Sequence, residues 1–528
     1  MSDQGNNHSY SSSETKPLPE HLEKGALTSR IQAIQRLHDG QGPGGDHRLV
    51  VDVKEAEREY GIEVASALKT TEDGSCILWP QPREDPNDPL NWSGFKKNYT
   101  LAIISLATVI PDFTSSIGIA SLFPLSKQFD TTVNHVNNLT SNWSIFLLGP
   151  GGILAVILIS SFGRLPVLFW SQVVGLGFLI GCTVAPTLTV FATTRCLQSF
   201  FSTAPQVVGL YFIKDIFFWH QEARKVNIWT FSFVVSPFLE TNWRWAYGIG
   251  CIYSGIVLLL IVLFLDESMY DRKYFPAPIP STKGLRYRIE TLVGITGFKM
   301  YKYRVPILTA VWRPLKTLLN LRILLACIFM GVTFGWTIGI NVTLVIFLQT
   351  PAPLGYGMNS DQSSAMYLTP IVAALLGELA GHWLNDFVAK QYIKRHHGVF
   401  RPEARLVVPY VGSFWATVGL VTIGASLGKL LSIAGVIFGW GMVRIHVTSM
   451  YAYCSDLLPD RQGEISALLN WARVLGGFSV GYYQVPWAEQ SGALQVFGVE
   501  AAIVVGVTAL VIPVLQFIAP RFESGSHE

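Results

Sequence analysis

Apolar residues dominate the chain from residue 99 to residue 518, where they form long runs separated by short polar segments. The hydrocarbon core of a bilayer is about 30 Å thick, so a helix that rises ~1.5 Å per residue needs about 20 apolar residues to cross it. About eleven of the runs are near that length, and a helix in a soluble core rarely needs so long a run. The pattern predicts an all-α membrane protein that crosses the bilayer many times.

The runs fall into two groups separated by a basic linker, which divides the chain into two membrane halves. The predicted segments are 99–123, 141–162, 165–185, 188–213, 226–239 and 243–265 in the first half, and 321–348, 364–384, 405–427, 431–454, 464–484 and 493–518 in the second. The resulting divisions are an N-terminal tail (1–94), a first half (95–265), the linker (266–320), a second half (321–518) and a C-terminal tail (519–528).

The polar N-terminal tail lacks the apolar core of a signal peptide, and we expect it to be disordered and cytoplasmic, with a short helix at residues 51–60. The linker holds ten Lys and Arg residues and the loop 385–404 holds four more, so the positive-inside rule places both termini in the cytoplasm. Within the linker, residues 283–304 fit either an interfacial helix or a solvated loop.

The fifth predicted segment, 226–239, is abnormally short. Its fourteen residues would span only about 21 Å as a helix. If the segment did not cross, the basic linker would lie outside the cell, against the charge rule. We therefore expect it to cross as a short or partly extended segment buried among other helices, unless the sequence lacks residues that a working protein has.

Composition agrees with a membrane protein, because 50% of residues are hydrophobic and 14% are charged, against about 25% charged residues in soluble domains. The net charge of +3 gives no reason to expect a nucleic-acid partner. The six cysteines form no metal-binding spacing, and the chain has no Walker motif and no HExxH or Ser/His/Asp constellation. The sequence therefore predicts no cofactor or metal, no direct use of ATP and no enzymatic activity.

Ionisable residues within the apolar segments are candidates for function, because a charge at mid-bilayer costs several kcal/mol. We interpret Asp112 and Glu378, one from each half, as proton or cation carriers, since a carboxyl group in a low dielectric can gain and lose a proton. Arg195 would be a charge partner for nearby carboxylates. The alternative is that these carboxylates are structural partners of an arginine or caps at a helix break.

Five further residues are secondary candidates: His382, Asp215, Glu500, Arg444 and Arg473. We expect polar packing for His382, a boundary position for Asp215 and a position near the outer interface for Glu500. Three aromatic residues could line a site for an amphipathic or cationic ligand, namely Trp336, Tyr367 and Trp440. Two residues of the first outer loop begin glycosylation sequons, namely Asn138 and Asn142.

Short motifs in a fixed order give the chain, from about residue 85 to its end, a resemblance to fungal major facilitator superfamily transporters of the drug:proton antiporter branch, whose relatives include polyspecific and polyamine transporters. The motifs are residues 88–92 (DPLNW), 163–167 (GRLPV), 195–198 (RCLQ), 223–225 (ARK), 229–233 (WTFSF), 242–245 (NWRW), 313–316 (RPLK), 398–406 (GVFRPEARL) and 482–485 (YYQV). The resemblance implies the major facilitator superfamily fold, with twelve helices in two six-helix halves and a substrate site near the midplane.

The chain departs from the family pattern at three places. Ser160 stands at the acidic position of the loop after the second helix, and Ser199 replaces the glycine that follows the fourth-helix arginine motif. The Gly-Pro-rich motif of the fifth helix is missing, since residues 236–242 pass directly from Ser-Pro-Phe to the next conserved pattern.

Together these features predict a proton-coupled secondary active transporter that exports a drug or secondary metabolite by alternating access. We expect a monomer in a fungal plasma membrane, or in the vacuolar membrane, whose partners are lipid, protons and a small-molecule substrate. Two alternatives stay open: uptake of an organic cation such as a polyamine, and a non-transporting or defective paralogue with a truncated fifth helix.

Overall fold

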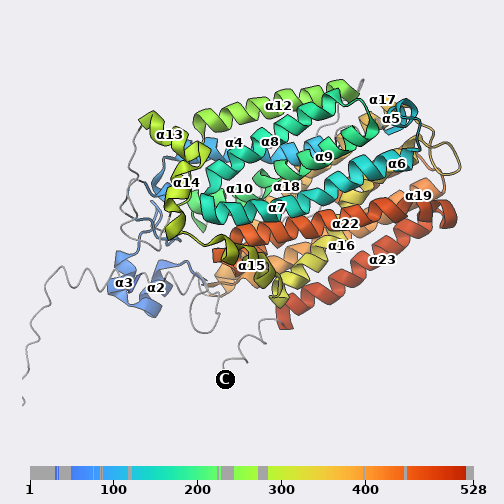
Figure 1. Ribbon diagram of the computed structural model, residues 1–528. Coiled ribbons are helices and arrows are strands. Elements are labelled where there is room, and N and C mark those ends of the chain that lie inside the picture. Colours follow the sequence, from blue (N-terminus) through green and yellow to red (C-terminus); the bar gives the residue numbers. More distant parts are fainter. Residues whose placement is uncertain are drawn as a thin grey trace, which may run out of the picture.

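The computed structural model is a bundle of long helices with a small folded unit at one end (Figure 1). It describes residues 30–31, 34, 49–74, 76–83, 85, 87–116, 122–219, 221–222, 225–226, 243–270, 284–396, 399–444 and 449–518.

The first half follows the predicted segments closely. Its helices are α4 (Gly94–Ser116), α5 (Leu122–Gln128), α6 (Val133–Asn137), α7 (Trp143–Phe162), α8 (Arg164–Val184), α9 (Leu188–Ser202), α10 (Ala204–Ile216) and α12 (Trp243–Phe264), with a π-helix at Asn138–Asn142. The fourth predicted segment is divided between α9 and α10, and Pro205 lies in the first turn of α10, where its missing N–H would have no partner within the helix. The fifth predicted segment lies outside the described residues apart from Val226.

The second half contains the longest helices of the bundle. Its elements are α16 (Leu321–Gln349), α17 (Ser360–Met366), α18 (Leu368–Arg395), α19 (Val408–Gly428), α20 (Ile433–Arg444), α21 (Ser449–Leu457), α22 (Gln462–Ser491) and α23 (Ala493–Pro513), with 3-10 helices at Pro402–Val407 and Pro459–Arg461 and a π-helix at Val514–Ile518. Helices α7 and α22 run side by side, so they join the first half to the second (Figure 1).

Six helical stretches within the described residues are long and apolar enough to cross a membrane. They are Val133–Phe162, Arg164–Val184, Arg244–Phe264, Leu321–Gln349, Pro402–Gly428 and Ala493–Phe517. Other helices that occupy predicted segments are more polar, as in α22, which carries Glu464, Arg473 and Glu489. These stretches agree with a multi-pass membrane protein, whereas the count of twelve crossing segments stays a prediction.

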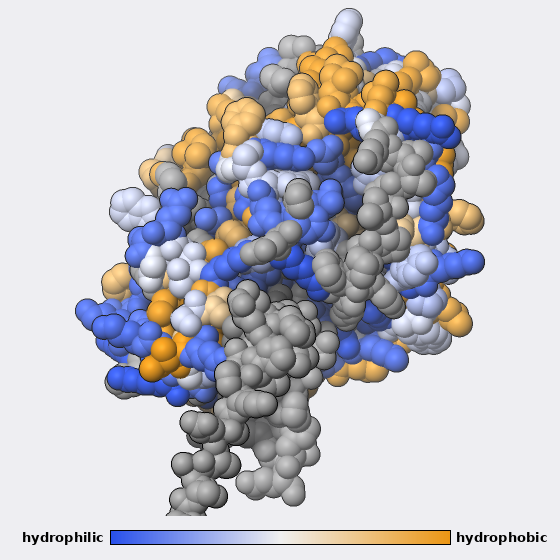
Figure 2. Space-filling view, turned by 90° about the vertical axis from the view of Figure 1, so that its left-hand side faces the viewer, coloured by the Kyte–Doolittle hydropathy of each residue, from blue (hydrophilic) through white to orange (hydrophobic). Residues whose placement is uncertain are grey.

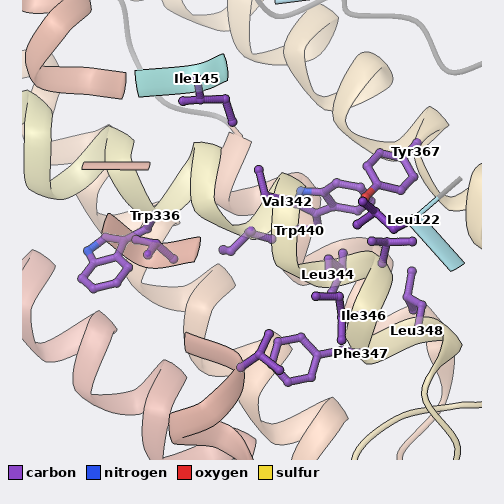
Figure 3. Packing of buried hydrophobic residues seen from close by; sticks show 14 of the residues in the cluster. Leu122, Ile145, Trp336, Val342, Leu344, Ile346, Phe347, Leu348, Tyr367 and Trp440 are labelled. Carbon is purple, nitrogen blue, oxygen red and sulfur yellow. The ribbon is translucent and has the colours of Figure 1, made fainter. Parts of the chain in front are cut away.

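Two large apolar clusters fill the bundle, and each draws side chains from both halves. Figure 3 shows part of one of them, in which Leu122 and Ile145 of the first half pack among residues of α16 such as Val342 and Phe347. Because this burial crosses the boundary between the halves, the structure holds them in close contact along their shared face.

The linker is helical over much of its described length. It forms α13 (Gly284–Val293), α14 (Ile295–Met300), a 3-10 turn at Tyr301–Tyr303 and α15 (Ile307–Leu318). Leu285 and Phe298 are 75% and 71% exposed, and Trp312 on α15 is 53% exposed. Large apolar side chains left uncovered beside basic residues fit an interfacial helix better than a solvated loop. Contact with lipid stays a prediction.

Part of the N-terminal tail is folded, which corrects the expectation of disorder for residues 49–91. Strand β1 (Leu49–Val50) pairs antiparallel with β2 (Val399–Phe400) of the second half, with Leu49 opposite Phe400. The predicted short helix is confirmed as α2 (Val53–Tyr60), whose first N–H groups are capped by the Asp52 carboxylate, and α3 (Ile62–Ala67) follows it.

A small apolar core holds this N-terminal unit together. Trp79 is 3% exposed, and its indole N–H donates to the Val50 carbonyl at 2.9 Å. The Trp79 carbonyl accepts from the backbone N–H of Trp219, just after α10, at 2.8 Å. The Trp219 ring lies 4.9 Å from the Phe400 ring. The unit therefore contacts both halves at one end of the bundle. Hydrophilic side chains gather on this end (Figure 2).

Candidate functional site

A carboxylate of the first half meets an arginine of the second half at the interface between them. Asp112 lies on α4, one residue after Pro111, and Arg473 lies on α22. The Arg473 Nη1 and Nη2 atoms are 3.2 Å and 3.3 Å from Asp112 Oδ2. The Arg473 side chain is 5% exposed and that of Asp112 is 16% exposed. Each charge compensates the other in a setting where a lone charge would be very unfavourable.

Neutral polar side chains extend this pair into a network between the halves. Arg473 donates to Asn470 Oδ1 from Nη2 at 2.7 Å and from Nε at 3.2 Å. The Asn470 amide in turn donates to Gln206 Oε1 on α10 at 3.2 Å, and the Ser466 hydroxyl donates to the Gln206 carbonyl at 3.1 Å. The guanidinium also lies 5.6 Å from the centre of the Phe334 ring. Helix α22 is thereby bonded to both α4 and α10.

The halves also touch nearer the N-terminal unit. The Tyr211 hydroxyl on α10 donates to Glu464 Oε2 on α22 at 3.3 Å, and the Ser455 hydroxyl on α21 donates to Glu222 at 3.1 Å. Gly463 permits this approach, because a Cβ there would lie 1.9 Å from the Tyr211 ring. Opening the bundle at this end requires these contacts to break.

Arg195 is buried within the first half. Its Nη2 donates to the Ser115 carbonyl on α4 at 2.5 Å, and its Nη1 donates to the Tyr247 hydroxyl on α12. The neighbouring Ser199, which replaces the family's glycine, shares a 3.2 Å hydrogen bond with the Ser115 hydroxyl. The arginine thus ties α9 to two other helices through neutral oxygens. Its role as a charge partner of carboxylates stays a prediction.

The turn between α7 and α8 is held by charged groups from distant parts of the chain. Gly163 adopts a φ of 106°, which favours glycine, and a Cβ there would lie 2.8 Å from Glu267 Oε2. That carboxylate accepts from the backbone N–H groups of Arg164 and Leu165, each at 3.1 Å. The Arg164 guanidinium forms an ion pair with Asp215. Asp215 is therefore a structural partner at this turn.

Sequence reasoning missed the contribution of Glu267. The acidic position of the family's loop is occupied by Ser160, whose hydroxyl donates to the carbonyl of Val156 within its own helix at 2.9 Å. The acidic group comes instead from the segment after α12, about a hundred residues later in the chain. The Asp266-Glu267 pair at the end of the sixth predicted segment was the available signal.

Glu500 on α23 is fully enclosed by protein, and its expected position near the outer interface stays a prediction. The Gln484 amide nitrogen on α22 donates to both Glu500 oxygens, at 2.8 Å and 3.1 Å. Gln484 Oε1 accepts from the Thr343 hydroxyl on α16. The exposed fraction of Glu500 is 0%. The sequence did not predict this enclosure, because distance along the segment does not show which neighbouring helices cover a side chain.

Three of the candidate side chains lie outside the described part of the chain, namely those of Glu378, His382 and Arg444. Their helices, α18 and α20, are described. The predicted roles of all three residues stay predictions.

The aromatic candidates lie in the apolar cluster shared by the two halves (Figure 3). Tyr367 and Trp440 are both fully buried, with ring centres 5.0 Å apart in an edge-to-face arrangement. The Tyr367 hydroxyl donates to the Asn341 carbonyl at 2.8 Å. Trp336 is 6.1 Å from the Tyr483 ring. They are close-packed here, and a role in lining a substrate site stays a prediction.

The structure argues against one of the two glycosylation candidates. Asn142 is fully buried, and its Nδ2 donates to Asn138 Oδ1 at 2.8 Å. A Cβ at Gly481 of α22 would lie 2.3 Å from Asn142 Oδ1, so the amide is packed against another helix. A glycan attached at this nitrogen has no room. Asn138 is only partly buried, and its glycosylation stays a prediction.

Comparisons with known proteins agree with this architecture. Residues 102–481 match the Major Facilitator Superfamily. The MFS transporter fsa7 of Fusarium sp. (strain FN080326) is 26% identical over 402 residues, which cover 72% of this chain and 75% of the relative. The MFS-type efflux pump MFS2 of Trichophyton rubrum is 25% identical over 417 residues, covering 72% and 65%. The proton:xylose symporter XylE superposes with a TM-score of 0.56 at 12% identity, over 81% of this chain and 97% of XylE.

The chain belongs to the Major Facilitator Superfamily, because the match covers well over half of its residues. It is therefore a multi-pass membrane transporter rather than an enzyme, and the predicted fold is confirmed. The likeness to XylE concerns the fold alone.

Proposed function

We propose that this protein is a proton-coupled secondary active transporter that exports small organic molecules by alternating access. The observation that carries the proposal is the partly buried ion pair between Asp112 and Arg473, which come from different halves. Alternating access moves one half against the other around a central site, so it needs contacts between the halves that can break and re-form.

Protonation supplies a way to break this contact. The attraction between the two side chains depends on the negative charge of Asp112, and a proton on that carboxylate removes the charge. Arg473 would keep its hydrogen bonds to Asn470 and lose its ionic partner. A proton that binds Asp112 therefore loosens the junction between α4 and α22, which couples proton binding to movement of the halves.

Export is the favoured direction because the relative from Trichophyton rubrum is named an efflux pump. We place the protein in a fungal plasma membrane as a monomer with both termini in the cytoplasm, in keeping with the basic linker and loop of the sequence. The exported molecule would be amphipathic, since the clusters at the boundary of the halves are apolar and aromatic.

Inside-out vesicles from yeast that produces the protein provide the test. With an acidic interior, they should accumulate ethidium, a model amphipathic compound, and a protonophore should abolish the accumulation. Asp112→Asn vesicles should not accumulate it, whereas Asp130→Asn, the same change at an exposed residue of the first half, should behave as the wild type. Ethidium accumulation that survives the protonophore or Asp112→Asn would overturn the coupling.

Intact cells of the same yeast separate the remaining alternatives. Proton-driven uptake of labelled spermidine into intact cells, without ethidium export, would replace export by cation import. A protein that reaches the membrane and moves neither compound, nor any of a wider panel, would favour a defective paralogue.

A further inference from the structure

Glu500 lies in a site whose three side chains can satisfy either protonation state of its carboxyl group. We propose that Glu500, Gln484 and Thr343 form a second proton-binding site, contained wholly within the second half. The inference rests on proton coupling as proposed above and adds a site with a different kind of partner. The proposed site lies near the turn between α22 and α23, at the end of the bundle opposite to α2 and α3 (Figure 1).

The hydrogen-bonding partner of Glu500 is a neutral amide. A buried carboxylate in proteins is ordinarily matched by a cation or a metal. Glu500 has instead the neutral amide of Gln484, which donates to Oε1 at 2.8 Å and to Oε2 at 3.1 Å. The negative charge is thus hydrogen-bonded without being compensated, so adding a proton costs no ion pair.

The helices that pack against α23 carry few charged residues. Helices α16, α19 and α22 pack against α23. Helix α19 has no Asp, Glu, Lys, Arg or His, and the one charged residue of α16, Arg322, lies at its far end. On α22, Arg473 is paired with Asp112, Glu489 is exposed, and Glu464 lies at the opposite end of the helix. The nearby titratable group is the Tyr483 phenol. No cation among the described residues of these helices neutralises Glu500.

The hydrogen-bond directions of the structure fit the ionised form of Glu500. The Gln484 amide nitrogen donates to Glu500, and the amide oxygen accepts the hydroxyl proton of Thr343. The Thr343 oxygen lies 3.0 Å from the carbonyl of Gly339, one turn earlier on α16. Because a hydroxyl has one proton, Thr343 can donate either to Gln484 or to Gly339.

The same three side chains can also accommodate a protonated Glu500. A proton taken from water binds one Glu500 oxygen, and the amide of Gln484 turns by about 180°, which exchanges its nitrogen and oxygen. The new carboxyl O–H then donates to Gln484 Oε1, the Gln484 nitrogen donates to the Thr343 oxygen, and the Thr343 proton turns to the Gly339 carbonyl. The carboxyl, amide and hydroxyl groups each keep at least one hydrogen bond, and protonation on α23 changes a hydrogen bond on α16.

Infrared difference spectroscopy of the purified protein in liposomes tests the site directly. The C=O stretching band of a protonated carboxylic acid should titrate with pH in the wild type and disappear in Glu500→Gln, which has the shape of the protonated form. Thr343→Val should keep the band and shift its titration midpoint, since it removes the hydroxyl that Gln484 contacts. The matched control is Glu489→Gln, the same change at an exposed residue five positions after Gln484, which should leave the band unchanged.

Transport in the same liposomes separates this inference from the proposed function. Glu500→Gln should still bind ethidium and should lose the pH dependence of its transport, while Glu489→Gln keeps both. A wild type with no proton-driven transport would refute the proposed function. A wild type that is proton-driven, together with a Glu500→Gln variant that retains the infrared band and the wild-type pH dependence, would refute the second site alone. Should Glu500→Gln fail to fold, the Thr343→Val midpoint decides: an unchanged midpoint overturns the inference.

Discussion

Two carboxylates within the helix bundle have opposite kinds of partner. Asp112 faces an arginine from the other half of the chain, whereas Glu500 is bonded by an amide from a neighbouring helix of its own half. The positive charge of Arg473 stabilises the ionised form of Asp112. Protonation of Asp112 therefore weakens the contact between the two halves and lets them move. A neutral partner accepts either form and leaves the halves in place. The type of partner therefore distinguishes a group that moves the halves from one that binds a proton within one of them.

Of the variants that test this difference between Asp112 and Glu500, Asp112→Asn should have the largest effect on transport and stability. The variant should lose proton-driven transport, and loss of the ion pair with Arg473 should lower the free energy of unfolding by about 3–5 kcal/mol. Thermal unfolding in detergent and vesicle transport measure the two effects. The exchange of the two residues, Asp112→Arg with Arg473→Asp, should recover much of the stability and none of the transport. Recovery of both would show that the position of the carboxylate on α4 is unimportant.

Trp79→Ala provides an equally large change that touches neither carboxylate. Trp79 is almost fully buried in the N-terminal unit, and truncation of such a side chain typically costs about 3–5 kcal/mol. Limited proteolysis should cut residues 49–91 much faster than in the wild type, while the pH dependence of transport stays unchanged. Trp245→Ala, at a tryptophan that is 69% exposed, is the matched control and should alter neither measurement. A shifted pH dependence in Trp79→Ala would connect the unit to proton coupling.

Asn470→Ala should have a smaller effect. It removes the neutral acceptor of Arg473 and the donor to Gln206 but keeps the ion pair with Asp112. We expect a loss of about 1–3 kcal/mol of stability, as for a buried group left without its partner, and slower transport that is still proton-driven. Asn134→Ala, at an exposed position of α6, should match the wild type. Complete loss of coupling in Asn470→Ala would mean that Asp112 alone does not hold Arg473 in place.

The smallest effect is expected outside the membrane helices, at Asp85. Its carboxylate accepts from the Asn87 backbone N–H at 2.9 Å and from the Tyr270 hydroxyl at 2.7 Å, and these bonds hold the pKa of Asp85 below its ordinary value. A lowered pKa in the folded state contributes stability above the ordinary pKa of an aspartate, and that contribution is lost as pH falls through the lowered value. Tyr270→Phe should therefore unfold slightly more easily at neutral pH.

The difference at Asp85 should disappear in acid. Tryptophan fluorescence during thermal unfolding, recorded from neutral to acidic pH, measures it, with Tyr287→Phe of the linker as the control. A Tyr270→Phe difference that grows toward acid would contradict the sign of the pKa shift.

Much of the fold could be predicted from the sequence because a bilayer imposes a length on every crossing helix. The described helices follow all the predicted segments except 226–239, and the two halves lie where the basic linker divides them. The N-terminal unit could not be predicted in this way. Its few apolar residues, such as Val50 and Trp79, gain partners from residues 219 and 399–400, and such contacts leave no periodic pattern in the sequence.

The candidate site was predictable in part. The cost of a buried charge singled out Asp112, Arg473 and Glu500, but spacing along the chain could not show that the first two form a pair across 361 positions. The neutral groups that complete both sites, Gln484 and Asn470 among them, carry no charge and gave no signal. Burial and pairing depend on how helices pack, and that information becomes available only in three dimensions.

Simultaneous recording of proton and ethidium fluxes in liposomes, with the membrane potential clamped to zero, tests the central claim most directly. The account predicts that each ethidium flux is accompanied by protons moving in the opposite direction, and that Asp112→Asn abolishes both. Ethidium transport without an accompanying proton flux, or an unchanged proton flux in Asp112→Asn, would contradict it.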